Sequence, residues 1–132
     1  MNATVGIVLV SHSAALAQGA AELAGQMGGG LVRVVAAGGT DDDRLGTSIG
    51  KVRDALAEAD TGAGVVILPD LGSSVLTVRA LLAQEEPLPA PLEVADAPFV
   101  EGAVAATVAA ASGAGIAAVL TAAQEARHAR KL

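Results

Sequence analysis

The sequence contains no cysteine, tryptophan or tyrosine and only one phenylalanine in 132 residues. Without cysteine it has no disulfide framework and no thiolate metal site. Without aromatic side chains it offers no platform on which the bases of single-stranded nucleic acid stack. Basic residues are also few, 8 against 14 acidic ones, and the net charge of −6 argues against binding to a phosphate backbone. We therefore expect no nucleic-acid partner.

A leader peptide and a membrane span are not expected either. The N-terminal "MNATVGIVLV" has no basic segment before its apolar run. The apolar stretch Val100–Leu120 contains Glu101 and consists mostly of alanine, which inserts poorly into a bilayer. We expect a cytoplasmic protein with no membrane contact, folded as a single domain over residues 1–132.

The pattern of apolar residues predicts alternating strands and helices. Short β-branched runs are typical of strands buried on both faces, and they occur at Thr4–Val10, Leu31–Ala37 and Gly64–Pro69. Helices are expected from Ser13 to Met27, from Thr47 to Asp60 and over 75–85, where Glu85 ends "VLTVRALLAQE". A Pro-rich connector leads to a short strand, "LEVAD", and two Ala-rich helices finish the chain. This order predicts an α/β fold, an open and mostly parallel sheet between layers of helices.

Two details of the helices are specific enough to check. The first helix carries one apolar stripe, Leu16, Ala20, Leu23 and Met27, and the second carries Ile49, Val52, Leu56 and Ala59. The glycines 28–30 are expected to end the first helix in the left-handed conformation.

Polar residues that do not serve solubility follow three of the strands. His12 follows the first strand, Gly38, Gly39 and Thr40 follow the second, and Asp70, Gly72, Ser73 and Ser74 follow the third. In open parallel sheets, ligands and chemistry gather at the carboxyl ends of the strands. If the first strand is central, the three loops converge at one edge of the sheet.

His12 has several possible roles: a residue at a helix N-terminus, a buried hydrogen-bonding group, a metal ligand or a nucleophile. A strand end is a rigid mount for a reacting group. A neutral imidazole with one free nitrogen is available at cytoplasmic pH. An anion attached to it at the start of a helix would meet free N–H groups. Covalent phosphohistidine catalysis uses all three features.

Asp70 has two interpretations that the sequence leaves open. As a partner of His12 it would hold the second ring nitrogen and stabilise positive charge on the ring. As a structural residue it would be an N-cap or form an Asx-turn before the helix that begins near Ser73 or Ser74. The candidate catalytic pair is therefore His12 and Asp70, and the candidate phosphoryl-binding residues are Ser13, Gly39, Thr40, Gly72, Ser73 and Ser74.

Other motifs in the chain do not fit their usual contexts. "GTSIGKV" resembles a P-loop but lacks its first glycine and the hydroxyl residue after Lys51. "GAGIAA" lies between two late helices rather than after the first strand. The acidic run Asp41–Asp43 has no further ligand at metal-binding spacing, so it is read as a solvated loop. We expect no metal and no cofactor.

Taken together, the motifs resemble those of a known family. The ordered set S-H-S, G-G-T, G-T-S-x-x-K and D-L-G-S, spread from about Val5 to Glu125, resembles the phosphotransferase subunits of phosphoenolpyruvate-dependent dihydroxyacetone kinases. These subunits have the mannose-type enzyme IIA fold, which implies a homodimer and a sheet in the order 2-1-3-4. Since the chain ends at Leu132, it resembles the single-domain form of the family.

The resemblance implies a phosphoryl relay centred on His12. The histidine would accept phosphate on Nε2 from the histidine-containing phosphocarrier protein and pass it to ADP on the nucleotide-binding subunit of the kinase. Two alternatives stay open: a component of a mannose-type sugar transporter, and a non-catalytic module that binds a small anion.

Overall fold

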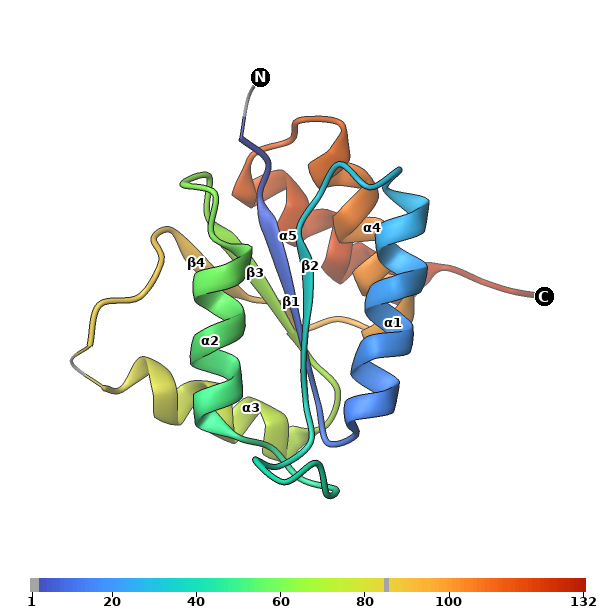
Figure 1. Cartoon of the computed structure of the whole chain (residues 1–132). Helices are drawn as coiled ribbons and strands as arrows, with labels where there is room; N and C mark the ends of the chain where they lie inside the picture. Colours follow the sequence, from blue (N-terminus) through green and yellow to red (C-terminus); the bar gives the residue numbers. More distant parts are fainter. Residues whose placement is uncertain (1–2, 85) are drawn as a thin grey trace.

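The computed structural model describes residues 3–84 and 86–132, and its strands form one parallel sheet (Figure 1). The strands are β1 (Gly6–Ser11), β2 (Val34–Gly38), β3 (Val65–Pro69) and β4 (Leu92–Val94). In the described part of the chain their order is β2-β1-β3-β4, and each neighbouring pair is parallel. The predicted α/β fold and the 2-1-3-4 order are confirmed.

Helices cover both faces of the sheet. They are α1 (Ala14–Met27), α2 (Ile49–Ala59), α3 (Gly72–Leu82), α4 (Phe99–Ala111) and α5 (Ile116–Glu125), followed by the 3-10 turn η1 (Ala126–His128). On one face Ile7 and Leu9 of β1 pack in a core with α1, α4 and α5. Val8 and Val10 point to the other face and pack with α2 and α3. Because β1 and β3 are buried on both faces, their residues form continuous apolar runs.

Helix α1 buries alanines rather than the larger residues of its predicted stripe. Ala17, Ala20 and Ala24 are buried, whereas Leu16, Leu23 and Met27 are about half exposed. The small side chains let α1 approach the sheet and α4 closely. Hydrophobicity alone therefore selected the wrong face, with only Ala20 common to both sets. On α2 the predicted residues Val52, Leu56 and Ala59 are buried as expected.

Helix α3 begins earlier than the sequence predicts. It starts at Gly72 instead of Val75, and it ends at Leu82. The expected end at Glu85 lies outside the described residues. Gly72, Ser73 and Ser74 therefore occupy the first turn of the helix rather than a loop, which presents their polar groups in a fixed arrangement. Gly29 and Gly30 have left-handed backbone angles after α1, as expected. The prediction is wrong for Gly28, the C-cap residue, whose φ is −84°.

The carboxyl ends of β1, β2 and β3 meet at one edge of the sheet, the lower edge in Figure 1. The residues that follow each strand turn there into α1, into the segment that leads to α2, and into α3. Among the helices that the structure describes, none combines the length and the apolar character needed to cross a bilayer.

Gly38 makes this edge possible because α1 starts directly against it. A Cβ atom at Gly38 would lie 2.5 Å from the carbonyl oxygen of Ser13 and 2.8 Å from Cα of Ala14. Both are backbone atoms and cannot move aside cheaply. We expect Gly38→Ala to lower the free energy of unfolding by about 1–3 kcal/mol, as measured by urea denaturation.

Gly19 offers a matched control on the exposed surface of α1. A Cβ atom there meets nothing within 4 Å, and alanine favours the helix, so Gly19→Ala is expected to raise stability by up to about 1 kcal/mol. Equal stability of the two variants would contradict a steric role for Gly38.

Candidate functional site

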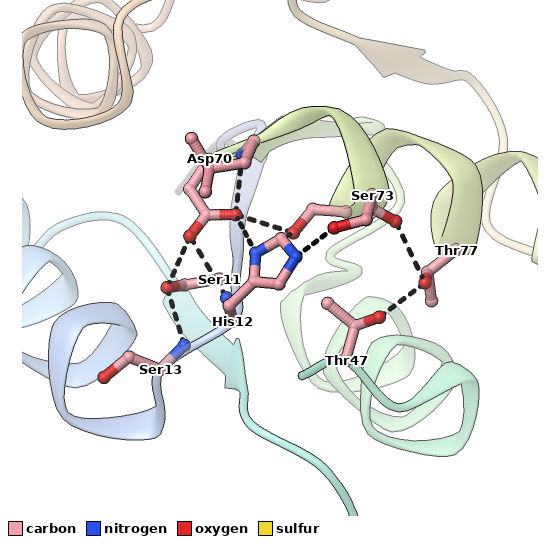
Figure 2. Close-up of polar contacts among 9 residues, drawn as sticks. Ser11, His12, Ser13, Thr47, Asp70, Ser73 and Thr77 are labelled. Atoms are coloured by element: carbon pink, nitrogen blue, oxygen red, sulfur yellow. Dashed lines mark hydrogen bonds and ion pairs between the residues drawn. The ribbon is translucent and has the colours of Figure 1, made fainter. Parts of the chain in front are cut away.

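His12 is the residue that follows β1, and its ring is held from one side by Asp70 (Figure 2). Nδ1 of His12 lies 2.9 Å from Oδ1 of Asp70, and the backbone N–H of His12 donates to Oδ2 at 3.1 Å. The imidazole is 25% exposed, whereas the carboxylate is only 8% exposed. The histidine is thus fixed by a nearly buried partner while one edge of its ring remains accessible.

Asp70 reaches His12 because their strands are neighbours. Val10 of β1 lies opposite Pro69 of β3, and the N–H of Asp70 donates to the carbonyl of Val10 at 2.9 Å. Five groups then donate to the carboxylate: the two groups of His12, the hydroxyls of Ser11 (2.8 Å) and Ser74 (2.6 Å), and the N–H of Leu71 (2.7 Å). The carboxylate oxygens are therefore saturated with donors.

This environment keeps Asp70 ionised. Burial on its own raises the pKa of Asp70, but the hydrogen bonds from Ser74, His12 and Ser11 outweigh burial and lower the pKa to about 2. An ionised Asp70 accepts only, so Nδ1 of His12 must carry the proton that joins them.

With the proton on Nδ1, the lone pair of the neutral ring is on Nε2. This nitrogen is in close contact with the hydroxyl of Ser73, which points toward it from the first turn of α3 (Figure 2). Ser74 lies nearer the other nitrogen, its Oγ 3.2 Å from Nδ1. The geometry leaves Nε2 as the ring nitrogen that carries the lone pair, next to the exposed hydroxyl of Ser73.

The other candidate residues surround the pair without bonding to the ring. Ser13 is the N-cap of α1, where its hydroxyl accepts from the N–H of Leu16. Gly39 has a left-handed φ of 78° and donates its N–H to the carbonyl of Ser11. The hydroxyl of Thr40 donates to Asp42 within its own loop. These three residues shape the edge of the site.

Gly72 and Ser73 are the first two residues of α3, and Ser73 contacts the ring of His12. The N-cap residue of α3 is Leu71, and within the described chain no side chain caps this helix. Asp70 bonds the N–H of Leu71 and therefore does not act as the N-cap that the sequence left open. The first N–H groups of a helix lack intrahelical partners and attract anions.

Two parts of the hydrogen-bond network around His12 and Asp70 involve residues that were not among the candidates predicted from the sequence. Ser11 is fully buried and links Asp70 to the N–H of Ser13 at 3.0 Å. Thr47 and Thr77 share a hydrogen bond of 2.5 Å, which joins the start of α2 to α3. A hydroxyl residue at the end of an otherwise apolar strand was the available signal for Ser11. No pattern in the sequence predicts the pairing of the two threonines.

The depressed pKa of Asp70 has a consequence for stability. A carboxyl group with a pKa of about 2 instead of 3.8 stabilises the folded state above about pH 4, and this contribution disappears as the pH falls toward 2. We expect Asp70→Asn to lower the free energy of unfolding by about 2 kcal/mol near neutral pH. The gap to the wild type should close progressively in urea titrations between about pH 4 and about pH 2.

Asp54→Asn is the control for this measurement because it removes an exposed carboxylate of α2. It is expected to stay within about 0.5 kcal/mol of the wild type at every pH. A gap for Asp70→Asn that is constant with pH would show that lost packing, and not the carboxylate charge, causes the destabilisation.

Comparison with known proteins gives a consistent set of relatives. The family model EIIA-man, described as the PTS system fructose IIA component, matches residues 6–120. The phosphoryl donor subunit DhaM of the PEP-dependent dihydroxyacetone kinase from Providencia stuartii is 37% identical over 131 residues, 96% of this chain. The chain spans only 28% of the length of that relative.

Shorter relatives match along most of their length. The phosphoryl donor subunit DhaM of PEP-dependent dihydroxyacetone kinase 2 from Listeria innocua is 37% identical over 105 residues, which cover 79% of this chain and 84% of that one. The crystal structure of EF1359, a protein of unknown function, superposes with a TM-score of 0.79 at 32% identity and covers 93% of this chain and 95% of that chain. The chain therefore belongs to the EIIA-man family, the family of the fructose IIA component of the phosphotransferase system.

Proposed function

We propose that this protein is a phosphoryl relay that works through His12. It accepts a phosphoryl group from the histidine-containing phosphocarrier protein and passes it to ADP on the nucleotide-binding subunit of a dihydroxyacetone kinase. The observation that carries the proposal is the orientation of the ring: Asp70 holds Nδ1 at 2.9 Å, and Nε2 is turned to the accessible edge.

Both transfers take place at Nε2, and in each one the bond that forms is matched by a bond that breaks. In the first, the lone pair of Nε2 attacks the phosphorus of the carrier's phosphohistidine, a new N–P bond forms, and the old N–P bond breaks with its electrons returning to the carrier's ring. In the second, a β-phosphate oxygen of ADP attacks the same phosphorus, and the N–P electrons return to Nε2 as ATP forms. Throughout, Nδ1 keeps its proton and Asp70 balances the positive charge that the phosphorylated ring carries.

The start of α3 supports the anionic part of this cycle. When a phosphoryl group is on Nε2, the hydroxyl of Ser73 must rotate away from the nitrogen, and it then donates to a phosphoryl oxygen. The N–H groups of Gly72 and Ser73 and the positive end of the α3 dipole favour the same group. Ser13, Gly39, Thr40 and Ser74 contribute by fixing the surrounding loops and Asp70.

The relatives favour the kinase over a sugar transporter as the destination. Matched proteins from both Providencia stuartii and Listeria innocua are described as phosphoryl donor subunits of PEP-dependent dihydroxyacetone kinases.

A homodimer belongs to the same proposal. The supporting observation is a set of half-exposed apolar side chains on two contacting helices, which a second copy of the chain would cover: Leu16, Leu23 and Met27 of α1 and Val108 of α4. Sedimentation equilibrium measures the oligomeric state.

The test is a reconstitution with phosphoenolpyruvate, enzyme I and the phosphocarrier protein. We expect one phosphoryl group per chain, labile in acid and stable in base as N-linked phosphate is, and mapped to His12 by mass spectrometry. Adding the ADP-loaded kinase subunit should discharge the label. Reversible anion binding without a covalent label would instead support the non-catalytic module.

A further inference from the structure

The outer side of β2 is an open edge of the sheet. In the described part of the chain, β1 is the only strand beside it. The N–H of Ile7 in β1 donates to the carbonyl of Arg33, so Arg33 directs its peptide groups toward β1. In a parallel pair, the peptide groups of successive residues face alternate sides of the strand. The N–H and C=O groups of Val34 and Ala36 therefore point outward, away from β1.

A groove runs along this edge between α1 and α2, which stand on either side of β2 in Figure 1. Three neighbouring hollows form it, and Val35 of β2 and Glu58 of α2 line all three. At one end, Nζ of Lys51 donates at 3.0 Å to the carbonyl of Gly38, the next outward carbonyl after that of Ala36. The groove is closed at this end and presents free peptide groups along its floor.

The strand itself has none of three common protections of a sheet edge. Proteins usually place a proline, a charged residue or a bulge on an exposed edge strand, which stops it from pairing with another chain. The sequence of β2, VVAAG, contains no proline and no charged residue. Its register with β1 continues from Val34 to Gly38 without a bulge. Such an edge can accept an extended segment as a further strand.

Acidic side chains line both walls of the groove. Glu22 of α1 lies on one side, and Asp54 and Glu58 of α2 lie on the other. All three are exposed, and among the residues that the structure describes no basic side chain pairs with their carboxylates. The basic residues at the groove, Arg33 and Lys51, bond to other groups. The walls therefore carry negative charge that attracts basic side chains.

We propose that the groove along β2 binds an extended, basic segment of a partner protein, which pairs with Val34 and Ala36 as an additional strand. Alternate side chains of a strand point to opposite faces of the sheet. One set of the segment's side chains would meet Glu22 on α1, and the other set would meet Asp54 and Glu58 on α2. Basic residues at either set of positions are thus complementary to the groove. The inference does not depend on the phosphoryl relay.

The same charges argue against a second copy of this chain as the occupant. Pairing of β2 with β2 of another copy would bring the acidic walls of the two grooves together. The whole chain carries a net charge of −6, which adds to the repulsion between copies. A basic segment from a different protein neutralises the walls instead.

The test uses a hexapeptide of alternating lysine and valine, with both ends blocked, as the probe. We expect a saturating concentration of the probe to slow hydrogen exchange of the Val34 and Ala36 amides by at least about tenfold, measured by NMR. The amide of Val35 faces β1 and is the internal reference, with little change expected. A fully N-methylated version of the peptide keeps the charges but has no backbone donors, and it should give no protection.

Two charge variants test the walls of the groove. Glu58→Lys is expected to raise the Kd of the probe about tenfold at low salt, because it replaces attraction by repulsion. Glu125→Lys is the matched control: it makes the same change of charge at an exposed position of α5 that does not line the groove. It should bind the probe with the wild-type Kd.

Ala36→Pro tests the strand pairing directly. Proline is tolerated on an edge strand where the N–H faces outward, so the variant should fold, which circular dichroism checks, and should not bind the probe. If it does not fold, Glu58→Lys and Glu125→Lys decide the question.

Four results would overturn the proposal. They are a wild type that does not bind the probe, equal binding of the N-methylated peptide, equal Kd values for the two lysine variants, and binding by a folded Ala36→Pro. Protection of Val34 and Ala36 in the free protein that increases with protein concentration would overturn it as well, because a second copy would then occupy the edge.

Discussion

Replacing His12 by glutamine is expected to reduce the acid-labile phosphoryl label to background, a loss of at least about a thousandfold. Glutamine keeps groups that hydrogen-bond to Asp70 and Ser73, but its amide nitrogen has no lone pair available for attack on phosphorus. The site would remain polar and folded while losing its proposed nucleophile. The measurement is the initial rate of label incorporation from the phosphorylated carrier protein.

The chain provides its own control, because it contains only one other histidine. His128 is exposed in η1, near the C-terminus. His128→Gln is expected to be labelled to the same extent and at the same rate as the wild type. Label that survives in His12→Gln, or that disappears in His128→Gln, would move the nucleophile away from β1.

The central strands were predictable because a strand that is buried on both faces consists almost entirely of apolar residues. β1 and β3 are central in the sheet and covered on both faces, so they form unbroken apolar runs that the sequence shows directly. β2 is at the edge of the sheet and only partly buried, and its start was placed too early, at Leu31 instead of Val34. The order 2-1-3-4 came from the family resemblance and not from these runs.

The buried face of α1 was not predictable from hydrophobicity, because α1 packs closely against the sheet and α4 and only small side chains fit between them. A leucine-based stripe assumes that the largest apolar side chains are buried. Ala17 and Ala24 are fully buried instead, and a close-packed interior leaves little room for a longer side chain. In a sequence so rich in alanine, the helix face is decided by how closely helix and sheet approach.

The candidate site was predictable as far as topology determines it. Parallel neighbours place their carboxyl ends together, which is why His12 and Asp70 meet across β1 and β3. The side chain of Thr40 follows β2 but bonds within its own loop. The hydrogen-bond partner of Thr40 depends on the backbone path of residues 39–46, including the left-handed φ of 62° at Asp43. No periodic pattern in the sequence predicts such a path.

The second large effect is expected at Asp70. Asp70→Asn should slow phosphoryl transfer through His12 by about tenfold to a thousandfold. The carboxylate holds the proton on Nδ1 and, in the proposed relay, balances the charge of the phosphorylated ring, whereas an amide is uncharged and can present either a donor or an acceptor to Nδ1. The substitution therefore weakens both the orientation of Nε2 and the stabilisation of the transition state. Single-turnover transfer from the carrier measures the combined loss.

Ser74→Ala separates the charge of Asp70 from the network around it. This variant removes one donor to Oδ1, the 2.6 Å bond, but keeps the carboxylate and its contact with Nδ1, so its transfer rate should fall by less than about tenfold. ¹⁵N spectra of the imidazole add a readout that mere destabilisation would not move. The wild type and Ser74→Ala should carry the neutral-ring proton on Nδ1, and Asp70→Asn should show a mixture of tautomers. A wild-type transfer rate in Asp70→Asn, with the tautomer unchanged, would leave Asp70 as a structural residue that ties β1 to α3.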